Sequence, residues 1–251
     1  MSGHSKWANI KRRKESVDAR RGKIFTRIAR ELQVAARAGG PDPEMNLRLR
    51  LVLDKAKAAN MPKDNIERAI ARGAGLEKGD ELEEVTYEGY ASSGVALLIE
   101  TMTDNRNRTV AEIRHVLTKG GGSMASAGSV AWQFDRKGQL IVAANGRDQE
   151  EVFLEAIDAG AEDVYFNEDG SAEIVTADID LAAVRDRLHA AGYTIESAEL
   201  TMVAQNEVDL PAEETLKILG VLERLEDLDD VQRVHSNLAI DDALIAEFEA
   251  A

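Results

Sequence analysis

Cysteine is absent from this chain of 251 residues. Its absence excludes disulfides, thiolate zinc sites, iron–sulfur clusters and cysteine nucleophiles, and it fits a reducing compartment. The sequence also lacks any apolar run approaching the roughly 20 residues that span a bilayer, so no membrane partner is expected. The first stretch, Met1–Trp7, has no apolar core of the kind that secretory signals carry. Together these absences predict a cytoplasmic protein.

Patterns typical of catalytic or metal sites are missing as well. The four histidines stand far apart, and none forms a His-Glu-x-x-His pair. Asp178 and Asp180 lack the glycine and the distal glutamate of a calcium loop. The chain contains no Gly-x-Ser-x-Gly nucleophile elbow. The sequence therefore predicts a protein that is not an enzyme, with no metal, cofactor or small-molecule substrate.

Charge is distributed unevenly along the chain. Overall, 46 acidic and 31 basic residues give a net charge of -15 and a pI near 4.8, which argues against binding nucleic acid over the whole surface. Residues 1–78, however, hold 19 basic and nine acidic residues, a net charge of +10, whereas residues 79–251 carry -25. Such an asymmetry is typical of a chain with a nucleic-acid-binding or membrane-binding segment.

The first third of the chain is predicted to be helical. Apolar residues over Ile24–Ala35 recur at helical spacing, and Gly39–Pro41 ends that helix. A second apolar stripe covers Met45–Ala56, and a third helix runs from the turn at Pro62 to Gly73. Basic side chains lie off these stripes, so we expect a small bundle with a basic exterior. Residues 73–80 are predicted to form a linker.

After the linker, strands and helices alternate. The first expected elements are a strand, a helix and a strand, at Val95–Met102, Thr109–Lys119 and Ser129–Phe134. A second cycle over residues 139–203 has the order β-α-β-β-α-β, which is ferredoxin-like. The tail adds a helix from Pro211 to about Leu228 and a strand at Val231–Leu238. The helix expected at Gln149–Ala159 has apolar positions whose inward face the spacing does not fix.

This order predicts an α+β fold in which an N-terminal helical bundle precedes two α+β (ferredoxin-like) domains, one inserted in the other. The strand, helix and strand before residue 135 and those after residue 203 are expected to complete one sandwich. The predicted domains are a basic helical domain (1–78), a discontinuous α+β domain (79–135 plus 204–251) and an inserted ferredoxin-like domain (136–203).

The strongest motif is a basic arm. Residues 1–37 contain 11 basic and three acidic side chains, with the run Lys11–Lys14 at its centre. Lys and Arg gain affinity by displacing counterions from phosphate, and an aromatic such as Trp7 can stack on a base. The alternative is a solvated helix face, but such faces usually mix both signs, so polyanion binding is favoured. Trp7 has its own alternative, a cap on the bundle core.

Two weaker motifs follow. Residues 103–109 place Arg106 and Arg108 at a strand-to-helix junction, where they either hold phosphate or pair with local acids beside a helix cap. The glycine-rich stretch 119–129 lacks the Walker pattern and follows a helix, so a nucleotide site is not expected. It is interpreted as a loop that contacts a partner or as a long connection.

These motifs give two sets of candidate residues. The predicted nucleic-acid-binding residues are Lys6, Trp7, Lys11, Arg12, Arg13, Lys14, Arg20, Arg21, Lys23, Arg27, Arg106 and Arg108. The predicted partner-contact loop consists of Gly120, Gly121, Gly122, Ser123 and Met124.

Several stretches of the chain resemble the YebC/PmpR family, which includes the mitochondrial translational activator of cytochrome c oxidase. The stretches are Gly3–Lys11, Arg21–Phe25, Ala59–Asp64, Glu67–Ile70, Tyr87–Tyr90, Asp104–Thr109 and Gly128–Trp132. The similarity covers essentially the whole chain. Two departures are visible: Arg12 stands where the family often has His, and Ala91–Ser93 replaces a Gly-Pro-Gly-like turn.

The resemblance implies a helical N-terminal domain and two α+β domains, one inserted in the other. It also implies DNA-binding transcription regulation, the usual description of the family, or, as the alternative, a translation factor that contacts RNA on the ribosome. The expected partner is therefore DNA or, in the alternative, ribosomal RNA within the ribosome. The sequence shows no helix-turn-helix with a recognition helix, and its acidic part would be repelled by bare duplex phosphate. Both modes stay open.

Overall fold

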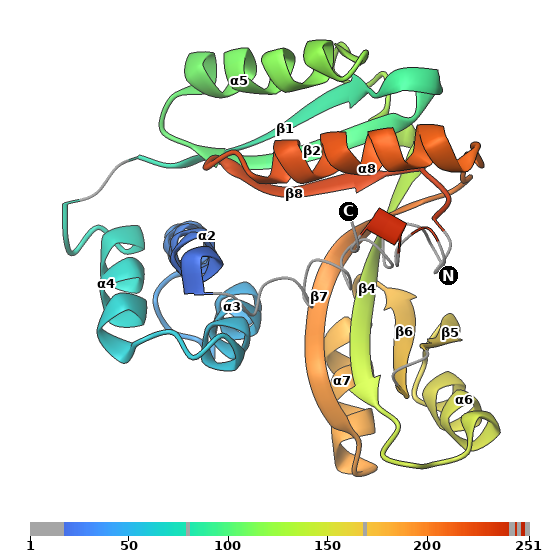
Figure 1. Cartoon of the computed structure of the whole chain (residues 1–251). Coiled ribbons are helices and arrows are strands. Elements are labelled where there is room, and N and C mark those ends of the chain that lie inside the picture. The colour runs from blue at the N-terminus through green and yellow to red at the C-terminus, as the bar shows by residue number, and fades with distance from the viewer. Residues whose placement is uncertain (1–17, 79–80, 168–169, 241–243, 245–246, 249–251) are drawn as a thin grey trace. The chain divides into compact units, whose positions relative to one another are not determined.

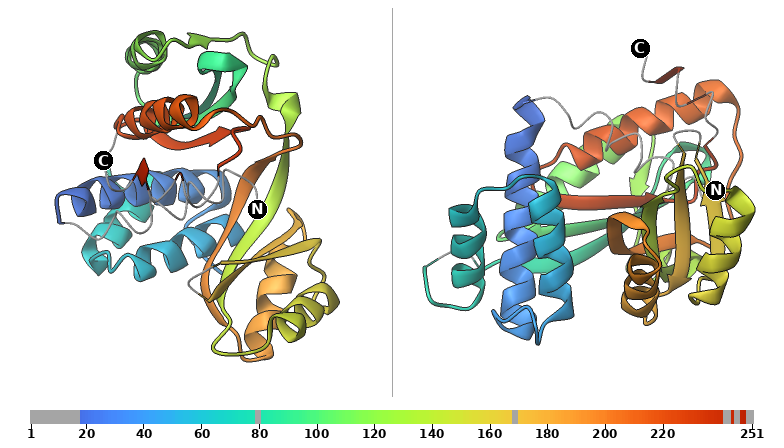
Figure 2. Two further views of the ribbon diagram at one scale, coloured as in Figure 1. Left: turned by 45° about the vertical axis from the view of Figure 1, so that its right-hand side comes forward. Right: turned by 90° about the horizontal axis from the view of Figure 1, so that it is seen from below.

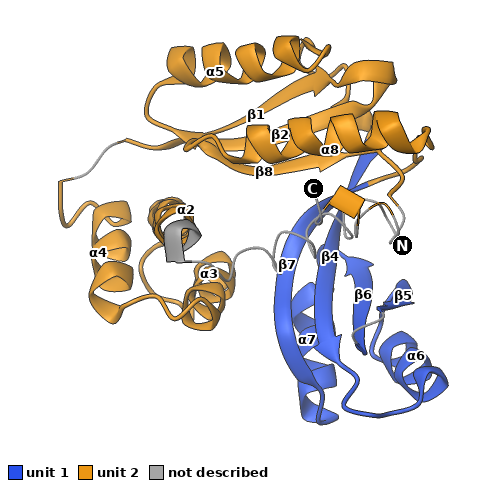
Figure 3. Cartoon of the chain, viewed as in Figure 1, with its two compact units in different colours: residues 1, 134–203 blue, residues 2–133, 204–251 orange. Residues whose placement is uncertain are grey.

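The computed structural model describes residues 18–78, 81–167, 170–240, 244 and 247–248. The chain falls into two compact units (Figure 3). Residues 134–203 form the inserted unit, and the described residues before 134 and after 203 form the discontinuous unit. The predicted α+β class, with helices first and two sheet-containing parts after them, is confirmed. The three predicted domain boundaries stay a prediction.

Among the described residues of the discontinuous unit, three helices come first. They are α2 (Asp18–Gly39), α3 (Leu47–Ala58) and α4 (Lys63–Gly73), and α2 lies between the other two (Figure 2). Ile28, Leu32 and Leu49 are fully buried among them. Burying one such side chain contributes about 2 kcal/mol to folding, so this apolar stripe is what holds the three helices together.

The start of α3 differs from the prediction. Met45 was expected in the apolar stripe, but its side chain is 84% exposed. The helix begins at Leu47 because Asn46 caps it, with its side-chain oxygen accepting from the Leu49 amide at 3.0 Å. The buried Asn46 amide nitrogen donates to the carbonyls of Ala35 and Gly40, so the cap also fixes the end of α2.

After these helices, the described part of the discontinuous unit contains a four-stranded antiparallel sheet in the order β3-β1-β2-β8, together with two longer helices (Figure 1). Its elements are β1 (Glu83–Tyr90), the short turn η1 (Ser92–Gly94), β2 (Ala96–Thr103), α5 (Arg106–Lys119), β3 (Ser123–Met124), α8 (Ala212–Glu226) and β8 (Val231–Ser236). Helices α5 and α8 cover one face and bury Leu97, Ile99 and Val234.

The inserted unit has the predicted ferredoxin-like order. Its elements are β4 (Phe134–Ala143), α6 (Gln149–Asp158), β5 (Asp163–Phe166), β6 (Ser171–Ala177), α7 (Leu181–Ala190) and β7 (Thr194–Ala204). The sheet order is β5-β6-β4-β7, with α6 and α7 on one face (Figure 1). Leu140, Ile174 and Leu188 are almost completely buried in this core. None of the helices among the described residues is long and apolar enough to cross a membrane.

Candidate nucleic-acid interface

Helix α2 carries the part of the predicted basic surface that the structure describes. The residues Lys6, Trp7, Lys11, Arg12, Arg13 and Lys14 lie outside the described residues. Arg20 and Arg21 belong to the first turns of α2, and Lys23 and Arg27 follow one turn apart. The structure therefore places the last four predicted contacts of the arm on a single helix.

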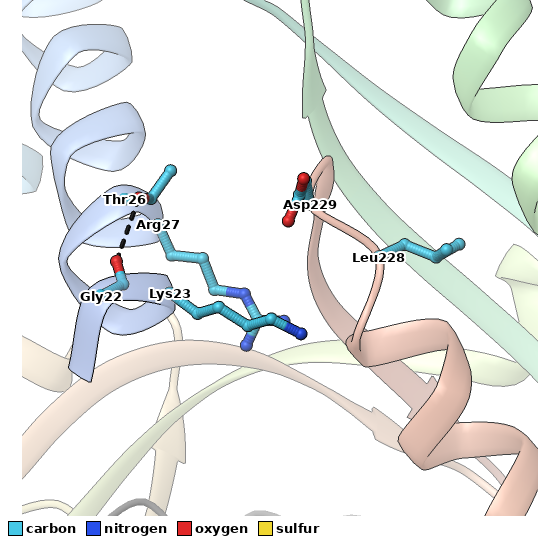
Figure 4. Close-up of a pocket in the computed structure, with 6 residues that line it drawn as sticks. All are labelled: Gly22, Lys23, Thr26, Arg27, Leu228 and Asp229. Carbon is cyan, nitrogen blue, oxygen red and sulfur yellow. Dashed lines mark hydrogen bonds between the residues drawn. The ribbon is translucent and has the colours of Figure 1, made fainter. Parts of the chain in front are cut away.

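Lys23 and Arg27 reach the end of α8 (Figure 4). The Lys23 amine donates to the Asp227 carbonyl at 3.2 Å and to its carboxylate at 3.1 Å. Arg27 donates to the Glu226 carbonyl. The last carbonyls of a helix lack partners inside it and carry the negative end of its dipole, so two cations suit this place. These basic side chains thus cap α8 within the same unit.

The ion pair of Lys23 is more exposed than that of Arg30. Lys23 and Asp227 are 48% and 65% exposed, and such a surface ion pair contributes at most about 1 kcal/mol. Lys23 is therefore only weakly held by this ion pair, and phosphate binding by Lys23 stays a prediction. The side chain of Arg30, in contrast, is only 20% exposed, and its guanidinium lies 3.1 Å from the buried Asp230 carboxylate. Arg30, one of the 11 basic residues counted in the basic arm, thus acts as a structural residue.

Arg106 and Arg108, at the start of α5, have carboxylate partners. Arg106 pairs with Glu83, and Arg108 donates to Asp104 at 2.8 Å and to Asp230 at 2.7 Å. These partners raise the pKa of the Arg108 guanidinium, first through the hydrogen bond with Asp230. The helix is capped by Asn105, whose side chain accepts from the Arg108 amide. The arrangement follows the structural alternative, and a phosphate role for these arginines stays a prediction.

The buried carboxylate of Asp230 organises this junction. It accepts from the Thr103 and Thr109 hydroxyls at 3.1 and 2.7 Å, in addition to Arg108. Burial raises the pKa of Asp230, but the bonds from Arg108, Thr109 and Thr103 outweigh it and hold the pKa below its ordinary value. Sequence reasoning missed this residue because Arg108 and Asp230 are far apart along the chain.

The predicted partner-contact loop is partly built into the sheet. Gly120–Gly122 ends α5, and Ser123 and Met124 form β3, which pairs with Tyr90 and Gly89 of β1. A Cβ atom at Gly122 would meet the Tyr90 carbonyl oxygen at 2.3 Å, so a close backbone approach requires glycine there. Gly121 and Ser123 are exposed. A partner contact by this loop stays a prediction.

The following loop is held by a second buried carboxylate. Glu88 accepts from the amides of Gly128 at 2.7 Å, Ala131 at 3.0 Å and Val130. Burial raises its pKa, but these backbone bonds outweigh burial and leave the pKa below its ordinary value. The backbone amides that could otherwise bind an external anion are therefore occupied by the Glu88 carboxylate. The sequence pattern gave no sign of this role.

Trp132 lies next to this loop and is 67% exposed, with its indole N–H donating to the Ser129 carbonyl at 3.0 Å. An exposed tryptophan held in one orientation offers a stacking surface to a base. Sequence reasoning did not select it, although Trp is scarce in this chain. Within the ranges that the structure describes, no group of three His, Cys, Asp or Glu residues is arranged to hold a metal ion.

Comparison with known proteins accounts for both parts of the chain. Residues 5–76 match the family described as the TACO1/YebC protein N-terminal domain. Residues 82–238 match the family described as the TACO1/YebC second and third domain. The chain belongs to the TACO1/YebC family. The resemblance noted in the sequence is thereby confirmed.

Individual relatives of this TACO1/YebC chain are similar over their full length. The transcriptional regulatory protein PmpR of Pseudomonas aeruginosa is 52% identical over 98% of this chain and 99% of its own. A probable transcriptional regulatory protein of Moorella thermoacetica is 53% identical over 99% and 100%. The crystal structure of the conserved hypothetical protein Aq1575 from Aquifex aeolicus has a TM-score of 0.83 and 46% identity, covering 90% of this chain and 93% of that one.

Proposed function

We propose that this protein is a non-enzymatic regulator of gene expression that binds nucleic acid, in the first instance DNA, through its basic segment 1–78. The observation that carries the proposal is the charge split, +10 in that segment against -25 in the remainder. Its relatives are named as transcriptional regulatory proteins, which agrees with this role. Neutralising phosphate supplies most of the affinity of such proteins, and only this segment carries the required sign.

The second candidate function is a translation factor that contacts RNA on the ribosome. It is favoured by the acidic remainder, because 12 basic and 37 acidic residues repel bare duplex phosphate but suit the basic proteins of a ribosome. Family membership agrees with either mode. Photo-crosslinking from position 11 in cells separates them: promoter DNA in the adduct supports the first function, and ribosomal RNA supports the second.

The nucleic-acid contact itself is tested by removing the four charges of Lys11, Arg12, Arg13 and Lys14 in the full-length chain. With all four changed to Ala, we expect weaker binding to duplex DNA and to structured RNA. The plot of log affinity against log salt should lose about three to four units of slope, because each lost phosphate contact removes roughly 0.7 to 0.9 units. Fluorescence anisotropy over a salt series measures both quantities.

A matched control removes the same total charge elsewhere. Arg114, Arg136, Lys217 and Arg224 are exposed and lie beyond residue 78. Changing these four to Ala alters net charge equally and should leave the salt slope as in the wild-type chain. Equal losses in both variants would contradict a localised basic interface. An unchanged affinity in the arm variant would make the arm a solvated surface.

A further inference from the structure

We propose that the outer face of α6, in the inserted unit, is a docking surface for a basic protein segment. Helix α6 has two apolar faces. Val152 and Ala156 are fully buried against the sheet. On the other side, Phe153, Leu154 and Ile157 are 40%, 57% and 37% exposed. A helix at the surface of a sheet normally presents polar residues outward. The apolar side chains on this second face therefore lack a packing partner that covers them within the described structure.

The three exposed side chains form one patch. Residues three and four apart are neighbours on a helix, so Ile157 lies beside both Phe153 and Leu154. Contiguous apolar side chains at the surface mark sites of protein contact far more often than scattered ones do. Aromatic and large aliphatic anchors also dominate the energy of such contacts. We call Phe153, Leu154 and Ile157 the α6 patch.

The charged side chains around the α6 patch indicate which sign of charge a partner should carry. Glu150, Glu151 and Asp158 are exposed and lie within one helical turn of the patch. The whole inserted unit holds five basic and 16 acidic residues, a net charge of -11. An apolar centre with an acidic rim is complementary to an apolar side chain flanked by Lys and Arg.

The same charges disfavour the other occupants of an apolar surface. If two copies of this chain paired through their inserted units, each would bring a net charge of -11, and like charges across an interface are costly. Nucleic acid and the anionic surface of a membrane carry the same sign as the rim and are repelled as well. A basic protein segment is the class of partner that remains for the α6 patch. This inference does not depend on the nucleic-acid role of segment 1–78, because it uses different residues and the opposite charge.

The first experiment identifies the occupant. Leu154 is replaced in the full-length chain by the photo-crosslinker p-benzoylphenylalanine, and adducts formed in cells are mapped by mass spectrometry. The control carries the crosslinker at Ile179, which is 84% exposed and lies outside the patch. We expect an adduct to a Lys- and Arg-rich protein segment at position 154 alone. A second copy, nucleic acid, lipid, or a yield equal to that of the control would overturn the proposal.

The second experiment measures the contact with a synthetic peptide of the crosslinked segment. Changing Phe153, Leu154 and Ile157 to Ala should weaken binding at least tenfold, because the anchors are removed. The matched control changes Met45, Leu76 and Ile179 to Ala. These side chains are 84%, 77% and 84% exposed and lie outside the α6 patch.

The acidic rim is tested separately. Changing Glu150 and Glu151 to Gln and Asp158 to Asn should reduce the salt dependence of peptide binding. Circular dichroism verifies that each variant is folded. Wild-type affinity in the α6 patch variant would refute the docking surface.

Discussion

At the scale of single residues, Asp230 shows how one buried carboxylate joins distant parts of the discontinuous unit. Its two oxygens receive bonds from Arg30, Arg108, Thr103 and Thr109, which come from α2, α5 and the end of β2. Each donor offsets part of the cost of removing the charge from water. A buried charge whose partners are all present is tolerated, whereas removal of one member leaves the others uncompensated.

Changing Asp230 to Asn should therefore lower the free energy of unfolding by about 3 kcal/mol, because Arg108 and Arg30 lose their counter-charge. Urea unfolding measures the change. Asp229 is exposed, and changing it to Asn is expected to alter stability by less than about 0.5 kcal/mol. Equal effects at both positions would contradict the assignment.

The same variant should alter the response to acid. The native pKa of Asp230 lies below its ordinary value, so this carboxylate stabilises the fold above that ordinary value, near about 4. That stabilisation is lost as the pH falls through the native pKa. The Asn variant lacks this contribution, and its stability should decline less steeply than that of the wild type below about pH 5. Parallel acid profiles would be inconsistent with a charged Asp230.

At the scale of elements, periodicity predicted the helices and the ferredoxin-like order but missed β1 and misplaced one strand. Val85 and Tyr87 alternate with polar residues in β1, and the acidic residues there obscured the pattern. The strand expected at Ser129–Phe134 is wrong: a short helical turn, Ala131–Gln133, precedes β4. Glu88 accepts the Val130 and Ala131 amides, so these two amides are not available for pairing with another strand. Local spacing does not reveal such a distant partner.

The candidate interface was predictable to a similar extent. The sequence predicted that Lys23 and Arg27 lie on a basic helix, and they do. Their contacts with the end of α8 depend on packing between segments some 200 residues apart. The outward face of α6 was equally inaccessible, because Val152 and Leu154 have similar hydrophobicity and only the position of the sheet distinguishes them.

Two glycines in different elements should respond oppositely to the same substitution. In the β3 region, Gly122→Ala places a Cβ atom against the Tyr90 backbone and should cost about 2 kcal/mol. In α2, Gly22→Ala meets no atom within 4 Å and should stabilise by about 0.5 kcal/mol, because alanine is the better helix former. Thermal unfolding of both variants measures the loss of stability in one and the gain in the other. A stabilised Gly122→Ala protein would contradict the close approach of β3 to β1.

At the scale of the whole molecule, the inserted unit is continuous in sequence and the discontinuous unit is not. The core of the latter takes Leu97 and Ile99 from before the insertion, and Leu222 and Val234 from after it. One hydrogen bond, from the Gln205 amide to the Gln133 carbonyl at 2.9 Å, joins the two segments that flank the insertion. The inserted unit is therefore formed by one continuous stretch of chain, whereas the core of the other unit includes residues of the tail.

A chain that ends at residue 203 should separate the two units. We expect slow amide hydrogen exchange in residues 134–203, because their sheet and both helices are present. The sheet of β1 and β2 should exchange quickly, because α8 and β8 are missing from its core. Hydrogen exchange read by mass spectrometry compares this chain with the full-length protein. Equal protection of β1 and β2 in both would contradict the dependence on the tail.

Because the unit is discontinuous in sequence, two of its paired strands are synthesised at different times. Strand β2 ends at Thr103, and its neighbour β8 begins at Val231, so roughly 130 residues must be translated before the pair can form. At about 5 to 20 residues per second, that interval is on the order of 6 to 26 s. During this time the apolar edge of β2 lacks its partner strand. We therefore expect the newly made chain to be prone to aggregation for seconds, a hazard that a continuous arrangement of the same strands would reduce.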